Sequence, residues 1–579
     1  MRTTPGNDLI LGKLAGSHAS LGLSRTERDK HLHVVGSSGA GKTKFLENLI
    51  RQDIRQWSRS KCGMLVIDPH GNLYDNLINW LAWSGLKRPI IPIDLRQSDW
   101  VISYNVLRQR ESAPASVLIH NFIEAMAYVW GQSGTKETPL FAQWAWNIFN
   151  ALYEKKLTLI EAKYLVDREA KRIRHAMTHD LKDDASRQDW QFANSLSPKD
   201  YDSHIGSTVR RMRRFITNPT MSSMFGLPNV SLDLGRTLDE GSIILVNLAT
   251  ERAKISSQDA DLFATLLLSD LWTAAQERGK RDRIKPFYVY IDEFQQFVTP
   301  TIAENLDQAR GFGLHLTLAH QYPLQLSDRG ESGKRVFHSI MENAQSKVVF
   351  RLTYEENLRI MAEWLFMGVM DTDEVKKTLS SRKVMDYRRE MAESYGFSAS
   401  TGRSSGRQTG SASGSGLGGT SVYPFMGVLP DSTSQSWSTF ASDSESQSEG
   451  CSETETESRT YTPMLVPVMG AELSHIQFRS IDEQIFRAMG VLFDQTQRQG
   501  VARISGMNVP ASIYTPEVRK RPGSAKRTQT FLERCYEKLP FALPSGDARQ
   551  QIIDRAEKFT EELFKQLVDE PTAAKRRIK

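Results

Sequence analysis

The residues best suited to chemistry form a glycine-rich loop that reads GSSGAGKT. Its glycines let backbone N–H groups converge on a phosphate, Lys42 brings positive charge to the terminal phosphates of a nucleotide, and Thr43 offers a hydroxyl to Mg²⁺. The pattern GxxxxGK[ST] is complete, so it predicts a site for ATP and Mg²⁺. The expected nucleotide-binding residues are Gly36, Ser37, Ser38, Gly39, Ala40, Gly41, Lys42 and Thr43.

Two carboxylates follow an apolar run far downstream, where Phe287–Ile291 is succeeded by Asp292 and Glu293. We expect this strand to lie beside the strand that enters the glycine loop. Asp292 would then hold Mg²⁺, usually through water, and Glu293 would polarise the water that attacks the terminal phosphate. A strand that simply ends in solvated acids is the alternative.

A third candidate is Gln321, at the end of an apolar run over 314–318. A glutamine there can hydrogen-bond the terminal phosphate or the attacking water and report the state of the nucleotide. Arg310, just before this run, could reach the nucleotide of a neighbouring subunit and stabilise charge on the transferred phosphoryl group. Arg351 is a rival, and the residues alone do not decide between the two arginines.

Two further patterns have both structural and functional interpretations. Asp68 and His70, in the segment DPHG, follow a short apolar run at a position where ligands of open α/β sheets bind, although a sharp turn would also use Pro and Gly. A helical segment carries a cluster of arginines that could contact DNA phosphates or form a solvated face with salt bridges. The cluster consists of Arg210, Arg211, Arg213 and Arg214.

Short apolar runs that alternate with helical patterns must position these residues, and they predict an α/β fold with a mainly parallel sheet covered on both faces. The strand signals disappear over 113–232, where helical periodicity predicts an all-α insertion. The expected parts are a nucleotide-binding domain over 1–112 and 233–392 with this insertion between them, a Ser/Gly-rich acidic disordered segment over 393–462, a return to the core over 463–518, and a charged helical tail over 519–579.

Composition excludes several classes of protein. The chain has 74 Lys and Arg against 68 Asp and Glu, so its net charge of +6 does not by itself require a polyanionic partner. Three cysteines match neither a disulfide framework nor a CxxC metal site, which favours the reducing cytoplasm. No window reaches ~18 uninterrupted apolar residues. We therefore expect a cytoplasmic protein whose membrane association, where there is any, comes through a partner.

The motifs in this order resemble those of the TraD-type coupling ATPases of conjugation and type IV secretion, within the wider group of HerA- and FtsK-like DNA pumps. The resemblance rests on Gly36–Thr43, the segment IDPHGNL at 67–73, Ile291 to Glu293, and the segment LAHQ that ends at Gln321. It implies a RecA-like core, often with an inserted helical domain, in a hexameric ring. It also ranks Arg310 above Arg351 as an arginine that acts in trans. Coupling proteins usually begin with transmembrane helices, which this sequence lacks.

The resemblance implies an ATPase that moves DNA through a central channel. Its partners would be a relaxase and secretion-channel proteins. One alternative is a HerA-like motor that serves a separate nuclease or effector in DNA processing or phage defence. Another alternative, from a different class, is an ATPase that remodels or transports protein, with the acidic segment Ser442–Glu457 as a docking arm. The basic tail, Lys575–Arg577, could contact nucleic acid or be a soluble end.

Overall fold

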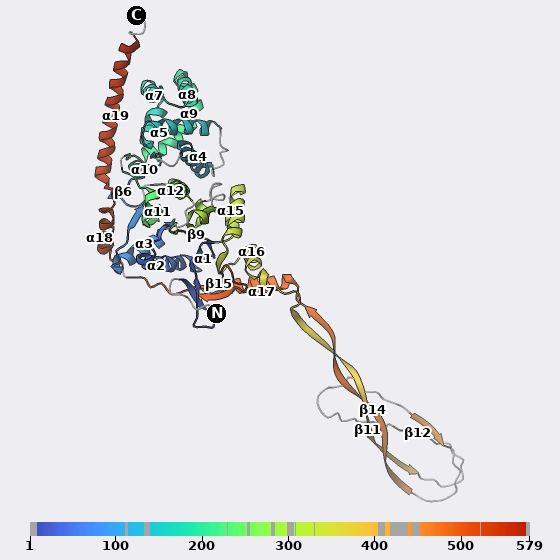
Figure 1. The fold of residues 1–579 in the computed structure, drawn as a ribbon. Helices are drawn as coiled ribbons and strands as arrows, with labels where there is room; N and C mark the ends of the chain where they lie inside the picture. The colour runs from blue at the N-terminus through green and yellow to red at the C-terminus, as the bar shows by residue number, and fades with distance from the viewer. Residues whose placement is uncertain are drawn as a thin grey trace. The chain divides into compact units, whose positions relative to one another are not determined.

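The computed structural model describes residues 8–109, 114–131, 139–228, 230–251, 255–279, 284–297, 306, 308–328, 330–402, 412–416, 438–442, 452–521 and 523–574. The chain forms two compact units. One unit consists of Met1–Met370 together with Ile481–Lys579, and the other consists of Asp371–Ser480 (Figure 1). The basic tail predicted at Lys575–Arg577 lies outside the described residues.

The first unit is built on an 11-stranded sheet. Seven strands are parallel: β3 (Leu32–Val35), β4 (Gly63–Asp68), β5 (Ile90–Asp94), β7 (Ile243–Asn247), β8 (Phe287–Ile291), β9 (Leu314–His320) and β10 (Ser346–Phe350). Four antiparallel strands extend one edge: β1 (Leu9–Leu14), β2 (Ser20–Leu23), β15 (Gln499–Arg503) and β16 (Ala511–Tyr514). The order is β2-β1-β16-β15-β10-β3-β9-β8-β4-β7-β5.

Alternating side chains of the central strands enter two separate hydrophobic cores. In β4, Leu65 and Ile67 join one core while Met64 and Val66 join the other. Because side chains alternate between the faces of a strand, a continuous apolar run fits a sheet that is covered on both faces. Pro92 lies in β5 at the free edge of the sheet, where a residue without an N–H disturbs no ladder. The predicted α/β class with a mainly parallel sheet is confirmed.

One expectation about the sheet is wrong. The acidic strand β8 does not lie beside β3, because β9 pairs with both of them and separates them. Asp292 still reaches the phosphate loop, since its contact is Thr43, which lies at the start of the following helix rather than on β3.

Helices cover the sheet and connect its strands. They are α1 (Arg25–Arg28), α2 (Lys42–Ser60), α3 (Asn72–Ser84), α12 (Ser257–Glu277), η2 (Phe294–Phe297), η3 (Ala309–Phe312), α14 (Leu324–Ser327), α15 (Gly330–Asn343), α16 (Glu355–Phe366), η4 (Met367–Val369) and α17 (Ile481–Phe493). A third, smaller core holds α16 and α17 against the sheet through Val349 and Val501. Among the described residues, no helix combines the length and apolar character needed to cross a membrane.

Between β6 (Trp100–Ile102) and β7 the described residues are helical or irregular (Figure 1). The helices are α4 (Ala115–Gly131), α5 (Pro139–Glu154), η1 (Leu159–Glu161), α6 (Ala162–Val166), α7 (Lys171–Thr178), α8 (Asp184–Ser195), α9 (Pro198–Thr217), α10 (Pro219–Phe225) and α11 (Leu234–Glu240). Ser197 caps α9 by accepting the N–H of Asp200, and Pro198 starts the helix. Aromatic residues such as Phe122, Phe149 and Phe215 pack at the centre of this insertion.

The C-terminal elements pack onto the first unit. They are α18 (Ala525–Tyr536), β17 (Ala542–Pro544) and α19 (Ser545–Ala574). β17 pairs antiparallel with β6, and the ring of Tyr536 stacks on Trp100 with 5.4 Å between the ring centroids. Tyr536 is almost fully buried. The segment 519–579, predicted as a charged helical tail, therefore also contains a strand that pairs with β6 and a tyrosine that is buried in the core.

The second unit is a two-stranded antiparallel ribbon of β11 (Val375–Gly402) and β14 (Ser452–Phe478), which wind around each other (Figure 1). A shorter pair joins β12 (Ala412–Gly416) and β13 (Ser438–Ser442). Strands at 393–402, 412–416, 438–442 and 452–462 correct the expectation that 393–462 is disordered throughout, because backbone pairing depends little on side-chain composition. The stretch 463–480 belongs to this unit, so the chain returns to the core at Ile481 rather than at residue 463.

Candidate active site

The phosphate loop joins β3 to α2 and lies close to the neighbouring strand. A Cβ atom on Gly36 would stand 2.5 Å from the Cβ of Phe350, closer than side chains approach, so only glycine fits. Gly41 has φ +113°, a conformation that glycine adopts readily. The N–H of Ser37 donates to the carbonyl oxygen of Arg351 at 2.8 Å. Strand β10 therefore fixes the start of the loop.

Helix α2 begins directly after the loop, at Lys42. Its N-cap residue, Gly41, has no side chain that could cap the first backbone N–H groups. These groups and the helix dipole favour an anion at this end of the helix. The residues Gly36–Thr43 thus fit the phosphates of a nucleotide.

Lys42 is 6% exposed, and its ammonium donates to the carbonyl oxygen of Gly36 at 2.6 Å. Burial lowers the pKa of Lys42, and the carboxylates of Glu293 and Asp292 oppose that shift. A lysine enclosed in this way is a positive charge in a region of low dielectric constant, where its attraction to a phosphate is strong.

Thr43 and Asp292 form the group that fits a divalent cation. The hydroxyl of Thr43 donates to a carboxylate oxygen of Asp292 at 2.9 Å. Burial, followed by repulsion from Glu293, raises the pKa of Asp292 to about 6, and a bound cation would reverse this effect. Hydroxyl and carboxylate oxygens are hard ligands of the kind that Mg²⁺ prefers.

Glu293 has a strained backbone and a closely held carboxylate. Its φ of +48° lies in the left-handed region, which costs a residue with a side chain ~1–3 kcal/mol and recurs at functional sites. The amide nitrogen of Gln295 donates to its carboxylate at 2.7 Å. The amide nitrogen of Gln321 lies 3.3 Å from each of its two carboxylate oxygens. The end of β9 is therefore joined to the end of β8 through this carboxylate.

The structure brings together five residues selected from the sequence, and it places Arg310 elsewhere. The five are Lys42, Thr43, Asp292, Glu293 and Gln321. Arg310 is exposed in η3, before the first residue of β9, whereas Gln321 follows its last residue. Seven residues at about 3.3 Å each separate the two ends of β9 by about 20 Å. Arg310 thus lies at the opposite edge of the sheet from the phosphate loop of its own chain.

The rival, Arg351, lies beside the phosphate loop of its own chain. Its carbonyl oxygen contacts Ser37, and its exposed guanidinium lies 5.7 Å from the ring centroid of Phe493. The two arginines therefore occupy opposite edges of the sheet.

The secondary candidates Asp68 and His70 shape a turn. The carboxylate of Asp68 is buried and accepts the N–H groups of His70 at 3.0 Å and Tyr74 at 2.9 Å, so it organises the start of α3. The side chain of His70 is exposed. This geometry favours the structural interpretation of the DPHG segment.

The arginine cluster of α9 divides into two pairs. Arg211 stacks over the ring of Phe141 with 4.3 Å between its guanidinium carbon and the ring centroid, and Arg214 donates to Gln258 at 2.8 Å. Arg210 and Arg213 are exposed and lie three residues apart on the same side of the helix. The cluster is therefore not four equivalent free cations.

Two residues at the site were not selected from the sequence. Gln295 is buried and holds Glu293, but a glutamine in a short 3₁₀ turn matches no motif. Arg498, with φ +71°, donates its N–H to the carbonyl oxygen of Ala40 at 3.2 Å, while its guanidinium binds the carbonyl oxygen of Thr515. It comes from a segment more than 450 residues from the loop, so spacing along the sequence gave no signal.

Comparisons with known proteins agree with this geometry. Residues 15–183 match the family model described as the type IV secretion-system coupling protein DNA-binding domain, and residues 286–412 match the model described as the TraM recognition site of TraD and TraG. The first match contains the phosphate loop, and the second contains Asp292, Glu293, Arg310 and Gln321. A comparison with curated proteins gives no match.

Solved structures with a similar fold include two of the coupling protein TrwB. The unbound monoclinic form of TrwBdeltaN70 is 12% identical, with a TM-score of 0.48, and the match covers 90% of this chain and 92% of that chain. The complex of TrwB with the ATP analogue ADPNP is 11% identical, with a TM-score of 0.45 and coverage of 90% and 92%. VirB4 of Thermoanaerobacter pseudethanolicus is 14% identical, with a TM-score of 0.44 and coverage of 63% and 89%.

Proposed function

Because the chain belongs to the TraD- and TrwB-type coupling ATPases of type IV secretion, we propose that it forms a ring and hydrolyses ATP to move DNA through a central channel. The observation that supports this most directly is the connected set of Thr43, Asp292, Glu293 and Gln321, which spans the phosphate loop and the ends of two strands. This set connects the proposed nucleotide site to the end of β9, where Gln321 can respond to the nucleotide.

The residues of this set have distinct roles in the proposal. Backbone N–H groups of Gly36–Thr43 and the ammonium of Lys42 bind the phosphates of ATP. Thr43 and Asp292 would hold Mg²⁺, which supplies positive charge that stabilises the phosphates during transfer. Glu293 orients and polarises the attacking water, and Gln321 senses the terminal phosphate through the same region.

Assembly into a ring would complete each site. The position of Arg310 at the far edge of the sheet supports action on the nucleotide of a neighbouring chain rather than on its own. An arginine supplied in trans stabilises the charge of the transferred phosphoryl group and accelerates transfer by about 10³–10⁵-fold in known cases. A hexamer is the assembly that the family resemblance implies.

DNA and a relaxosome protein are the proposed partners. The name of the family model over 15–183 supports DNA, and the name of the model over 286–412 supports a TraM-like partner protein. Arg210 and Arg213 are exposed cations that could contact DNA phosphates. Recruitment to a membrane through secretion-channel proteins belongs to the same proposal.

The test is ATP turnover by the purified full chain with and without DNA. Lys42→Ala should abolish DNA-stimulated turnover, because it removes the cation that binds the phosphates, whereas Glu293→Gln should bind ATP and hydrolyse it about 10²–10⁴-fold more slowly. Lys44→Ala is a matched control, since this partly exposed lysine of the same helix pairs with Glu47 and does not contact the loop.

Two outcomes would contradict the proposal. Turnover in Lys42→Ala equal to that of the unmodified chain would exclude the phosphate loop as the catalytic site. Turnover that is indifferent to DNA but is raised by a protein partner would replace DNA movement with protein transport or remodelling as the function.

A further inference from the structure

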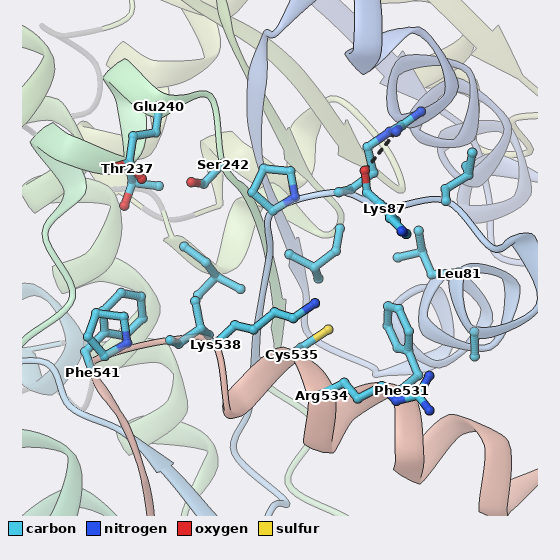
Figure 2. Close-up of a pocket in the computed structure, with 18 of the residues that line it drawn as sticks. Leu81, Lys87, Thr237, Glu240, Ser242, Phe531, Arg534, Cys535, Lys538 and Phe541 are labelled. Atoms are coloured by element: carbon cyan, nitrogen blue, oxygen red, sulfur yellow. Dashed lines mark hydrogen bonds between the residues drawn. The ribbon is translucent and has the colours of Figure 1, made fainter.

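A large cavity lies at the edge of the sheet opposite the phosphate loop. Its volume is about 1360 Å³, and its walls come from the end of α3, the start of β5, α11, and α18 with the loop that follows it. In Figure 2, Cys535 and Lys538 point toward its centre while Lys87 comes from the opposite wall. Because Ile90 begins β5 and Ser242 precedes β7, the cavity is at the amino ends of these strands. It is separate from the nucleotide site.

The lining of the cavity is strongly basic. It contains eight Lys and Arg residues against one Asp and one Glu, so six positive charges are in excess. This local excess is as large as the net charge of the whole chain, +6. The two acids are already paired: Asp233 with Arg108 at 2.9 Å, and Glu240 with Arg236 at 2.6 Å. A concave wall of one charge sign concentrates ligands of the opposite sign.

Two of the remaining cations are held by the backbone, and the others are free to bind. Arg88 donates to the carbonyl oxygen of Ile54, and Arg527 donates to that of Ala82. Four further lining cations form no ion pair with any residue that the structure describes, and all four are exposed. They are Lys87, Lys526, Arg534 and Lys538.

The floor of the cavity is apolar. Leu81 and Ile90 are buried beneath it, and Phe531, Leu539 and Phe541 line it as partly buried side chains of the C-terminal segment. Apolar surface of this kind gains free energy when it is covered, at ~25 cal/mol per Å². The cavity therefore combines a basic rim with an apolar floor.

These features favour a peptide over single-stranded nucleic acid. Single-strand sites place bases on open aromatic faces. Here the lining residue Trp57 is covered by the ammonium of Lys61 at 4.1 Å and by the guanidinium of Arg88 at 5.5 Å from its ring centroid, and the rings of Phe531 and Phe541 are partly buried. The apolar floor, which combines Leu81, Ile90 and Leu539 with Phe531 and Phe541, instead suits Leu, Ile or Val side chains. The volume also exceeds the ~300–1,000 Å³ of ordinary small-molecule pockets.

We propose that this cavity is a docking site for an acidic peptide segment of a partner protein, with carboxylates bound by Lys87, Lys526, Arg534 and Lys538 and aliphatic side chains placed on the floor. Binding at this site requires neither ATP nor the nucleotide-binding residues. Failure of the site and failure of ATP-driven DNA movement are therefore distinguishable.

The test uses the full chain and a fluorescein-labelled 12-residue peptide of alternating Glu and Leu, measured by fluorescence anisotropy. The double variant Arg534→Glu, Lys538→Glu should weaken binding at least tenfold and leave ATP turnover unchanged. Lys520→Glu, an exposed cation outside the lining, is the matched control and should bind as the unmodified chain does. A 12-residue peptide of alternating Lys and Leu and a 12-nucleotide single-stranded DNA are the probe controls.

Cys535 provides a second measurement that locates the peptide. Its thiol lies in the lining, and burial raises its pKa to about 11, so we expect it to react slowly with maleimide. A bound Glu–Leu peptide should slow this labelling further, as measured by mass spectrometry of the peptide that contains Cys535. The docking site is disproved if the Glu–Leu peptide does not bind, if the double variant binds it as well as Lys520→Glu does, or if only DNA protects Cys535.

Discussion

The carboxylate of Glu293 is held between two glutamine amides, from Gln295 and Gln321. The bond from Gln295 is the shorter, at 2.7 Å against 3.3 Å, and Gln295 is 4% exposed. A short bond from a buried donor fixes orientation, whereas a long bond from a strand end is easily broken when a phosphate competes for the same amide. At the scale of residues, we therefore propose that Gln295 positions the carboxylate and that Gln321 moves when a nucleotide binds.

Gln295→Leu tests this division of roles. The substitution preserves size but removes a hydrogen bond to a charged group, worth ~1.5–3 kcal/mol, so kcat should fall by about tenfold or more while the Kd for ATP is unchanged. The measurement is steady-state turnover beside equilibrium binding of a fluorescent ATP analogue. Gln295→Glu should not rescue kcat, because it places a second carboxylate against Glu293. An equal change in Kd and kcat would show that Gln295 only supports the local fold.

At the scale of elements, the length of the strand β9 bears on the proposal that the chain works in a ring. Gln321 at one end contacts the site of its own chain, while Arg310 at the other end is about 20 Å away along seven residues. A single strand would thus join two nucleotide sites of a ring.

Mixing inactive variants tests this arrangement. Arg310→Ala alone should reduce turnover by about 10³–10⁵-fold, and Lys42→Ala alone should abolish it. In mixed rings, however, an Arg310→Ala chain with an intact Lys42 can receive Arg310 from a Lys42→Ala neighbour, so turnover should partly recover. Arg335→Ala, an exposed arginine of α15, should remain active by itself. Mixtures with no recovery would place Arg310 outside the neighbour's site.

The individual parallel strands were predictable from the sequence, but the order in which they lie in the sheet was not. Each of the seven parallel strands coincides with a largely apolar run. For example, the runs at 64–67, 287–291 and 314–318 lie within β4, β8 and β9. The insertion of β9 between β3 and β8 depends on packing between distant segments, which no local pattern encodes. The ribbon strands β11 and β14 are rich in Ser, Thr and charged residues, and their pairing was missed for that reason.

The candidate site shows the same division. Lys42, Thr43, Asp292 and Glu293 were predictable because phosphate and metal chemistry requires those residue types at strand ends. Gln295 and Arg498 act through bonds to other protein groups, and such bonds can be made by many residue types at many positions. Their roles became visible only from the geometry.

At the scale of the whole molecule, we expect four buried histidines to make the free energy of unfolding depend on pH. Burial lowers the pKa of His31 to about 4, that of His315 to about 3 and that of His320 to about 4, and it holds the pKa of His33 well below its ordinary value. In the unfolded chain these groups titrate near 6.5. Below about pH 6.5 the unfolded state therefore binds more protons than the folded state, and each histidine lowers the free energy of unfolding as pH falls.

His31→Asn isolates one of these contributions. Asparagine tolerates the φ of +59° at this position and can still accept the N–H of Leu316, which lies 3.1 Å from the ring nitrogen of His31. The loss of stability between pH 6.5 and 4 should shrink by up to about 3 kcal/mol, since one unit of pKa shift is ~1.36 kcal/mol. Urea unfolding at pH 7 and pH 4.5 measures this difference. An unchanged difference would show that His31 is not a neutral buried group.

The pairing of distant strands in the main sheet has a consequence for synthesis. The first strand, β1, pairs with a strand that is synthesised much later. β1 pairs with β16, and about 500 residues separate them along the chain. A ribosome that adds ~5–20 residues per second needs roughly half a minute to two minutes to cover that length. Throughout this interval the edges of β1 and β10 lack the strands that later pair with them, and the loop at Ala40 lacks Arg498. We therefore expect the nascent chain to expose these unpaired strand edges until β15 and β16 have been synthesised, and the phosphate loop to gain its contact with Arg498 only at that stage.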